Sequence, residues 1–362
     1  MTRMQVDRLD PSSPRWSQLL SLVRHDVYHL PSFMAFAGRR QDAGQPGLVV
    51  AEEGGQYFLV PLIVREIPHS INGEGPRRFD ATSPRGYPGP LAALDAAPSS
   101  GTFADRAIAA VADYLRECGI VAVFSRLHPL LVPPIEAMQR AGTVVDHGDS
   151  WFIDLSLPDE TLWGQTRHGH RQDINKAARR GYVARIDEAW ERFDALVGSF
   201  QQSMDRVDAT AYWRLSRDYF VDLRDSLGDR LNLCVVERGE EVAAAGLLTE
   251  VDGIVEYHLS GTADAHVSAS PSKVVVDFAR RWAKSRGNRV LHLTGSLRRG
   301  DSLSHWKAGF SPLHSRVFSW RLITNPPEYR QLVDRWRAEH GGEADPIDGF
   351  FPAYRRPGPD VE

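Results

Sequence analysis

The chain has 362 residues, of which 42% are hydrophobic and 25% are charged, so it is long enough for two modest globular domains. The net charge of −4 argues against a protein that coats nucleic acid with its whole surface, but it is compatible with a local basic patch. The two cysteines, Cys118 and Cys234, lie in apolar stretches, so we expect no disulfide framework and a reducing compartment.

The chain shows no segment that is typical of membrane entry. Its first residues, MTRMQVDRLDPSSPRW, lack the apolar stretch of a signal peptide, and no run of about 18 apolar residues follows. We therefore expect a cytoplasmic protein without a membrane span, and the oligomeric state stays open.

The first half of the chain predicts a hairpin followed by alternating helices and strands. Residues 47–67 alternate apolar and polar side chains around a Glu-Gly-Gly turn, which indicates a hairpin. Apolar residues at helical spacing, ended by a glycine, then indicate a helix before a buried strand. The other elements expected here are helices at 14–26, 102–119 and 133–142 and strands at 120–129 and 150–157.

The second half repeats this order. Amphipathic helices come first, followed by a meander with Arg-Gly and Asp-Gly turns, a helix with serine near its start, and a buried strand. A short helix and a last strand complete the repeat. The expected helices are 189–204, 211–227, 270–287 and 302–310, and the expected strands are the meander 231–262 and the segments 289–296 and 315–323.

The repeated order predicts an α/β protein whose mixed sheets form two tandem domains. The join lies near Asp154–Glu160. We therefore expect an N-terminal domain at 1–157, a C-terminal domain at 158–330, and a C-terminal helix and tail at 331–362. One large α+β domain is the alternative arrangement.

This order of elements resembles the GNAT acyltransferase fold, and a tandem pair resembles the Fem family, which moves amino acids from aminoacyl-tRNA onto amines. Four segments strengthen the likeness and stand in the family's order. They are FDATSPRGYPGPL (79–91), FSRLHPLL (124–131), RHGHRQDINKAARRGY (167–182) and DSLSHWKAGF (301–310). The chain departs from the family pattern at Arg85, where tyrosine is common, and at Trp306, where phenylalanine is common.

The resemblance implies a transferase that forms an amide bond, with aminoacyl-tRNA as the donor and no tightly bound cofactor. The implied partners are the acceptor stem of tRNA and a small-molecule or nucleotide-linked amine acceptor, such as a peptidoglycan precursor or a natural-product intermediate. An acyl-CoA-dependent N-acyltransferase of the same fold is the alternative. However, residues 260–273 (SGTADAHVSASPSK) lack the glycine pair that lets backbone amides approach a pyrophosphate. A tandem GNAT protein that only binds a nucleotide sugar or RNA is the third hypothesis.

Cations gather in residues 167–182, where seven potentially positive groups stand against the single acid Asp173. We expect His170, Arg171 and Lys176 to bind the phosphates of a nucleotide-linked acceptor or of tRNA. A solvated charged face is the alternative. Because no carboxylate or cysteine cluster accompanies the histidines, we expect no metal site.

Residues 301–310 carry the groups best suited to chemistry at the donor. A buried lysine is costly unless it meets an anion, so Lys307 is predicted to be catalytic, and in the Fem-like hypothesis it holds the donor's carbonyl or phosphate. Trp306 offers a face for stacking on a base or ribose, with core packing as the alternative. Asp301 is predicted to cap the helix and to orient Lys307 or the amine, and His305 is predicted to bind substrate beside it.

In the second half, the strand that holds Tyr257 and Ser260 is predicted to border the same cleft. Alternation along a strand predicts that Tyr257 and Leu259 face one side while His258 and Ser260 face the other. His258 is a catalytic candidate, and a satisfied structural histidine is the alternative.

The remaining candidates lie in loops and at a strand end. Two prolines and two glycines make the loop around Tyr87 rigid, so this phenol and Arg85 are predicted to line the acceptor pocket. A pair at the carboxyl edge of a buried strand and a pair in a loop between two helices complete the set. These further substrate-binding candidates are Arg126, His128, Arg206 and Tyr212.

Overall fold

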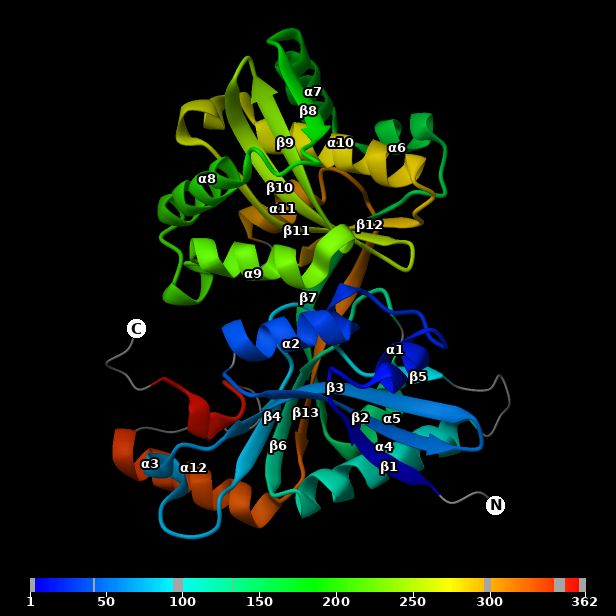
Figure 1. Ribbon diagram of the computed structural model, residues 1–362, viewed down its shortest axis with the longest axis vertical. Coiled ribbons are helices and arrows are strands. Elements are labelled where there is room, and N and C mark those ends of the chain that lie inside the picture. Colours follow the sequence, from blue (N-terminus) through cyan, green and yellow to red (C-terminus); the bar gives the residue numbers. More distant parts are fainter. Residues whose placement is uncertain are drawn as a thin grey trace. The chain divides into compact units, whose positions relative to one another are not determined.

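The computed structural model describes residues 4–41, 43–93, 100–131, 133–295, 301–341 and 349–357. The chain forms two units, of which unit 1 comprises Met1–His147 with Val317–Glu362 and unit 2 comprises Gly148–Arg316 (Figure 1). This division differs from the predicted boundaries at 157 and 330. Residues 342–348 and 358–362 of the predicted tail lie outside the described residues.

The division runs through two strands, because each half of the sequence gives its last strand to the other unit. β7 (Thr143–Asp154) follows the first half, yet its second part pairs antiparallel with β12 (Val290–Gly295) in unit 2. β13 (His314–Ile323) follows the second half, yet it pairs antiparallel with β6 (Ile120–Arg126) in unit 1. Pattern along the chain places each strand with the helix before it, which is why the predicted boundaries differ.

Unit 1 is built on a mixed sheet with the strand order β1-β2-β3-β4-β6-β13, and β5 pairs with β3. β4 and β6 run parallel, while the other described pairs are antiparallel. Its strands, besides those above, are β1 (Gln5–Leu9), β2 (Gln45–Glu53), β3 (Gln56–Glu66), β4 (Phe79–Thr82) and β5 (Leu91–Ala93). Its helices are α1 (Pro14–Leu20), η1 (Val27–His29), α2 (Pro31–Arg40), α3 (His69–Asn72), α4 (Ser100–Glu117), α5 (Ile135–Ala141), α12 (Pro326–His340) and η5 (Ala353–Arg355).

The predicted hairpin of unit 1 is confirmed. β2 pairs with β3 along the whole length of β2, and Gly54 and Gly55 between them have φ of 61° and 82°, which a two-residue turn of this kind requires. Val49 of β2 shares an apolar core with α4, and its neighbour Leu48 is equally buried on the other face. Both faces of the hairpin are therefore covered.

A buried carboxylate holds the C-terminal segment of unit 1. Asp80 on β4 is fully buried and accepts hydrogen bonds from Arg65 Nε (2.9 Å) and Arg355 Nε (2.6 Å). Arg355 also donates to the carbonyl of Glu66 (2.7 Å). One carboxylate thus joins three parts of the chain that are far apart in sequence.

In unit 2 the strand order is β7-β12-β11-β10-β9-β8, and β11 and β12 run parallel. The predicted meander is confirmed as β9, β10 and β11. The remaining strands are β8 (Tyr182–Ile186), β9 (Leu231–Arg238), β10 (Glu241–Val251) and β11 (Ile254–Thr262). The helices are α6 (Asp159–Gln165), α7 (His168–Arg179), α8 (Phe193–Arg206), η2 (Ala211–Trp213), α9 (Arg217–Leu227), η3 (Gly228–Arg230), η4 (Asp264–Ala269), α10 (Pro271–Ser285) and α11 (Ser302–Lys307).

Helices α8 and α10 cover opposite faces of the unit 2 sheet (Figure 1). A Cβ atom added to Gly261 would lie 2.2 Å from the backbone N of Phe200 on α8. A Cβ atom added to Gly246 would instead lie 3.1 Å from Val275 on α10. Glycine at these two positions lets each helix approach its own face of the sheet closely.

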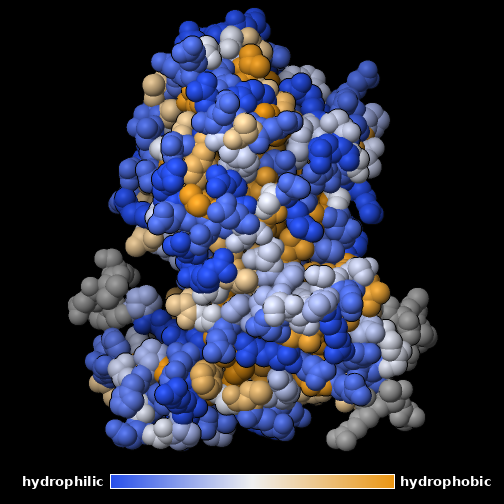
Figure 2. Space-filling view, viewed as in Figure 1, coloured by the Kyte–Doolittle hydropathy of each residue, from blue (hydrophilic) through white to orange (hydrophobic). Residues whose placement is uncertain are grey.

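The visible surface is mostly hydrophilic, and hydrophobic residues stand on it in small groups (Figure 2). Scattered apolar residues of this kind are normal on a protein surface. Within the ranges that the structure describes, no helix combines the length and the apolar character needed to cross a bilayer.

Substitution of Asp80 tests how much its contacts with Arg65 and Arg355 stabilise unit 1. Asp80→Asn leaves two arginines without their shared counter-charge, so we expect the free energy of unfolding to fall by about 3 kcal/mol. The matched control is Asp105→Asn, which breaks an exposed pair with Arg140 and should cost less than about 1 kcal/mol. Urea unfolding of the three proteins measures both values, and equal losses would show that Asp80 is not a special anchor.

Candidate active site

The candidate active site of unit 2 begins where two parallel strands separate. β11 and β12 pair only over Ile254–Glu256 and Val290–His292, and beyond that point β12 continues along β7. β11 continues along β10 instead. Ligands of open α/β sheets commonly bind where neighbouring parallel strands diverge at their carboxyl ends.

Both strands are irregular at this point. On β11, Leu259 and Tyr257 oppose consecutive residues of β10, so His258 is the extra residue of a β-bulge. On β12 the register shifts between His292 and Thr294, and Thr294 has a φ of 65°, which is rare for a β-branched residue.

The bulge corrects the predicted alternation along β11. A Cβ atom at Gly246 would meet both Tyr257 (3.0 Å) and Ser260 (3.6 Å), so these two side chains face the same side. The prediction that Ser260 shares a face with His258 rather than with Tyr257 was wrong, because the extra residue reverses the alternation. Burial raises the pKa of the Tyr257 hydroxyl, and a hydrogen bond from Ser260 works against this shift.

Lys307 lies at the end of α11 with only 5% of its surface exposed. Its Nζ donates to Thr294 Oγ1 (2.8 Å) and to the carbonyl of Gly295 (2.5 Å). Burial lowers the pKa of Lys307 to about 7, while the nearby carboxylates of Glu256 and Asp301 act in the opposite direction. Lys307 therefore changes between ammonium and amine near neutral pH.

The predicted cap of α11 is confirmed. The Asp301 side chain accepts a hydrogen bond from the backbone N of Ser304 (2.7 Å), which satisfies one of the free amides at the start of the helix. The cap fixes the direction in which α11 leaves the loop, and hence where Lys307 lies one and a half turns later.

Aromatic rings pack beside Lys307. Trp306 lies 6.4 Å from Tyr257 in a stacked arrangement and 4.9 Å from Phe310 edge-on, between ring centroids. His170 donates from Nε2 to the Trp306 carbonyl (3.0 Å), and burial lowers the pKa of His170. A Cβ atom at Gly309 would lie 2.3 Å from the His170 ring, so glycine is needed there. His170 thus joins α7 to α11 as a neutral group.

His305 is exposed on α11 and contacts the start of α7. Arg167 donates to His305 Nε2 (2.5 Å) and to its carbonyl (3.1 Å). Because Nε2 accepts this bond, the neutral His305 ring carries its proton on Nδ1. The structure therefore brings five predicted residues together in unit 2, namely Lys307, Trp306, Tyr257, His170 and His305.

Sequence analysis missed a row of buried polar residues beneath this site. Ser150 on β7, His292 on β12 and Glu256 on β11 are each at most 1% exposed. Ser150 Oγ lies 2.6 Å from His292 Nε2, and His292 Nδ1 lies 3.4 Å from Glu256 Oε1. Polar residues within otherwise apolar strand segments were the available signal, but only the strand order shows that they adjoin.

The cationic residues of α7 divide into two groups. Arg171 donates to the carbonyls of Trp163 (3.2 Å) and Gly164 (3.4 Å) and so closes the end of α6. The side chains of a second group, on the exposed face of the helix and at its end, make no ion pair with any described residue. This group, the α7 cations, consists of Lys176, Arg179 and Arg180.

Two further candidates, Arg206 and Tyr212, contact residues other than Lys307. Arg206 is the last residue of α8 rather than part of a loop, and it pairs with Asp264 and donates to Ser203 Oγ (2.8 Å). Tyr212 in η2 is 51% exposed and packs edge-on against Trp213, with 5.2 Å between ring centroids.

The candidates of unit 1 adjoin a buried polar cluster that the sequence did not reveal. His128 donates from Nε2 to Asp26 Oδ2 (2.9 Å) and accepts from the backbone N of Leu130 at Nδ1 (3.1 Å). His29 donates from Nε2 to the carbonyl of Gly89 (3.1 Å). Burial lowers the pKa of His29 to about 3, so this ring is neutral.

The other unit 1 candidates differ in their contacts: one packs against His128 through its ring, and the others are held through their backbone N. The Tyr87 ring lies edge-on to His128, with 6.0 Å between ring centroids. Arg85 is held through its backbone N, which donates to Gln41 Oε1 (2.6 Å). Arg126 ends β6, where its backbone N donates to the hydroxyl of a residue in the same loop as Tyr87.

The start of α10 is where this type of fold would hold a pyrophosphate. Here η4 precedes α10, Ser270 adopts the left-handed conformation with φ of 54°, and Pro271 occupies the first helical position without an amide hydrogen. The Lys273 side chain is paired with Asp173 (2.5 Å). This segment presents few free amides to an anion.

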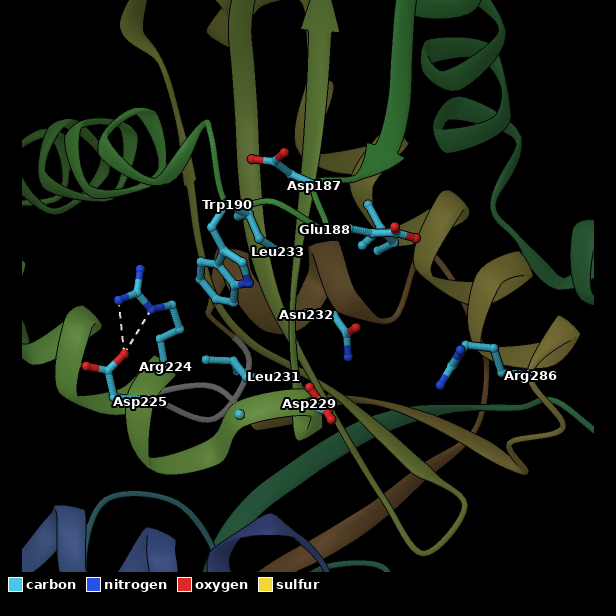
Figure 3. A pocket seen from close by; sticks show the side chains of 12 residues that line it. Asp187, Glu188, Trp190, Arg224, Asp225, Asp229, Leu231, Asn232, Leu233 and Arg286 are labelled. Atoms are coloured by element: carbon cyan, nitrogen blue, oxygen red, sulfur yellow. Dashed lines mark hydrogen bonds and ion pairs between the residues drawn. The ribbon is translucent and has the colours of Figure 1, made fainter.

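The pocket in Figure 3 lies at the other end of the sheet. Its volume is about 520 Å³, and the first residues of β9 line it. β9 runs in the same direction as β11, because both strands are antiparallel to β10. Arg224 in its wall is paired with Asp225, and Arg286 is paired with Glu250 (2.8 Å). The pocket thus lies at the amino ends of β9 and β11, away from the carboxyl ends where Lys307 lies, and these two cations in its wall are paired.

Comparison with known proteins agrees with the observed architecture. Residues 164–308, all in unit 2, match the family model described as Acetyltransferase (GNAT) domain. The structure is similar to that of FemX, with a TM-score of 0.66 and 11% identity over 90% of this chain and 99% of FemX. No curated protein sequence matches the chain.

Two further solved structures share the fold. One is the C-terminal domain of a putative lysylphosphatidylglycerol synthetase from Agrobacterium fabrum, with a TM-score of 0.53 and 14% identity over 92% of this chain and 96% of that one. The other is L-PGS from Bacillus licheniformis, with a TM-score of 0.53 and 13% identity over 90% and 97%. The predicted tandem GNAT-like fold is confirmed, and residues 164–308 match a family model of acetyltransferase (GNAT) domains.

The ionisation of Lys307 predicts a stability difference that depends on pH. Between about pH 7 and 10 the unfolded chain binds a proton that the folded Lys307 has lost, so folding stability rises with pH through this one group. Relative to Lys307→Met, the wild type should therefore gain free energy of unfolding as the pH rises from about 7 to 10. Below about pH 7 the difference between the two proteins should stay constant.

Urea unfolding of both proteins at about pH 6, 8 and 9.5 measures this difference. Lys176→Met, at an exposed position, is the matched control and should show no such trend. Parallel curves for the wild type and Lys307→Met would mean that Lys307 titrates like an ordinary exposed lysine.

Proposed function

We propose that this protein transfers an aminoacyl group from aminoacyl-tRNA to an amine acceptor and so forms an amide bond. The observation that carries the proposal is the ammonium group of Lys307, buried where β11 and β12 separate and held by neutral acceptors, Thr294 and Gly295. A buried donor of this kind is suited to stabilising an oxyanion. The proposed donor places the reaction in the cytoplasm.

The proposed reaction needs no covalent intermediate with the protein. The amine nitrogen attacks the ester carbonyl carbon, a C–N bond forms, and the carbonyl oxygen becomes an oxyanion. Lys307 donates its remaining N–H to this oxyanion. The C–O bond to the ribose then breaks, and the leaving hydroxyl takes the proton that the amine loses. The protein contributes position and charge rather than a nucleophile.

The start of α10 supports tRNA over acyl-CoA as the donor. A coenzyme A pyrophosphate requires several free backbone amides at a helix start, and glycines that let the phosphate approach them. Ser270, Pro271 and the paired Lys273 supply neither.

The α7 cations support a nucleic acid partner. Arg179 and Arg180 stand three and four residues after Lys176, about one helical turn, and the acid of this helix, Asp173, is already paired with Lys273. An unpaired group of exposed cations attracts the phosphates of an RNA backbone. We propose that it contacts the acceptor stem.

For the acceptor we propose an amine of a peptidoglycan precursor or of a natural-product intermediate. Tyr87 is held by its contact with His128, which is itself fixed by Asp26, so this phenol can orient an acceptor without large loss of entropy. We propose Tyr87 and Arg85 as acceptor-binding residues.

An acyl-CoA-dependent N-acyltransferase is the second candidate. The observation that favours it is the match of residues 164–308 to an acetyltransferase model. In that case Lys307 would face the carbonyl of a thioester instead of an ester.

Binding measured at several salt concentrations tests the donor. Binding of charged tRNA should weaken steeply with salt, and Lys176→Gln with Arg180→Gln should reduce the slope of log K against log[salt] by about 1 to 2. The matched control, Arg230→Gln with Arg289→Gln, removes the same charge from other exposed positions of unit 2 and should leave the slope unchanged.

Acetyl-CoA should not compete with the charged tRNA. Tight binding of acetyl-CoA without binding of tRNA would favour the acyl-CoA-dependent N-acyltransferase and refute the tRNA-dependent transferase. Loss of slope in the control variant as well would mean that the effect is one of net charge, not of the α7 cations.

A further inference from the structure

The buried polar residues near Lys307, namely Ser150, His292 and Glu256, contact one another in a row. Ser150 Oγ lies 2.6 Å from His292 Nε2, and a hydroxyl that donates here leaves the ring proton on Nδ1. Nδ1 faces Glu256 Oε1 at 3.4 Å. In this tautomer the ring presents its N–H to the Glu256 carboxyl group, whereas the other tautomer would present a lone pair to it.

The row is continuous with the residues that hold Lys307. His292 and Glu256 are directly paired at the last step of the parallel ladder between β12 and β11. Ser150 lies opposite Gly295 in the ladder between β7 and β12, and the carbonyl of Gly295 accepts a hydrogen bond from Lys307. The same few residues therefore position both the ammonium group and the carboxylate.

A buried ammonium group needs a negative charge nearby, and its hydrogen-bond partners among the described residues supply none. Thr294 and Gly295 are neutral acceptors, which satisfy N–H groups without offsetting the charge. Around Lys307, the described titratable groups are Glu256 on β11, His292 on β12, Tyr257 on β11, His170 on α7 and Asp301 on α11 itself. The carboxylates in this set are Glu256 and Asp301.

These two carboxylates differ in their exposure to water. Asp301 is partly exposed and accepts a hydrogen bond as the cap of α11, so solvent screens its charge. Glu256 is fully buried, and its charge acts through a medium that screens little. Glu256 should therefore influence Lys307 more strongly than Asp301 does.

We propose that Glu256, held in its ionised form by His292 and Ser150, is the positioning residue that keeps Lys307 in the ammonium form during the reaction. This inference rests on the proposed function, in which that ammonium group stabilises the oxyanion. Glu256 acts through Lys307 and does not touch the substrate. Ser150 and His292 act one step further away, because they set the proton position that faces Glu256.

The test follows the ionisation of Lys307 directly, without any substrate. The protein carries ¹³C at the carbon next to Nζ of its lysines, and the Lys307 signal is assigned by its loss in Lys307→Met. In Glu256→Gln the midpoint of the Lys307 titration should fall by about one pH unit or more, since a favourable charge is lost. In Asp301→Asn, where asparagine still caps the helix, the fall should be smaller.

Two further variants distinguish a loss of charge from a loss of folded structure. Ser150→Ala frees the His292 ring to take its other tautomer and should lower the Lys307 midpoint in the same direction by less than Glu256→Gln does. Glu256→Asp keeps the charge and should restore most of the wild-type midpoint. An unchanged midpoint in Glu256→Gln, or a larger shift in Asp301→Asn, would overturn the proposal.

Activity supplies the second readout. If the proposed function holds, the high-pH limb of kcat/KM for amide formation should move to lower pH in Glu256→Gln, together with the Lys307 midpoint. A uniform loss of rate at every pH, with no movement of the limb, would overturn the role of Glu256. A shifted midpoint in a protein that does not use charged tRNA would instead refute the proposed function and leave the charge relation intact.

Discussion

The burial of one ammonium group is the constraint on which the site of unit 2 depends. Removing the Lys307 charge from water is costly, so the surrounding elements must supply acceptors and counter-charge. A left-handed Thr294, the carbonyl of Gly295 and the capped start of α11 meet the first need, and buried Glu256 addresses the second. A sheet that only had to be stable would gain nothing from this arrangement, and this favours a functional reason for it.

The separation of two parallel strands makes room for that charge. Regular pairing of β11 and β12 stops at Glu256 and His292, and a bulge on each strand turns the following residues away from their expected faces. Strands that diverge free backbone groups and side chains at their carboxyl ends, and the residues we assign to chemistry lie at this point. The pocket of about 520 Å³ in unit 2 lies at the opposite ends of the strands, away from these residues.

Each half of the chain completes the unit of the other half. β7 pairs with β12 and β13 pairs with β6, so each unit includes a strand that follows the other repeat in the chain. The exchange also places Ser150, which follows the first repeat, in the buried row of unit 2 beside His292. A site residue thus comes from a segment that sequence order assigns to the other domain.

The sequence by itself determined the order of helices and strands, the turns at Gly54 and Gly55, the cap at Asp301 and the short helix that carries Lys307, because these depend on neighbours close in the chain. Only the tertiary structure decided which side of β11 bears Ser260, since one bulged residue reverses every later side chain. It also decided that Arg171 closes α6 while Lys176 stays exposed, and that Asp26 meets His128 across a hundred residues. Such pairings depend on which strands adjoin, and periodicity along a chain carries no record of that.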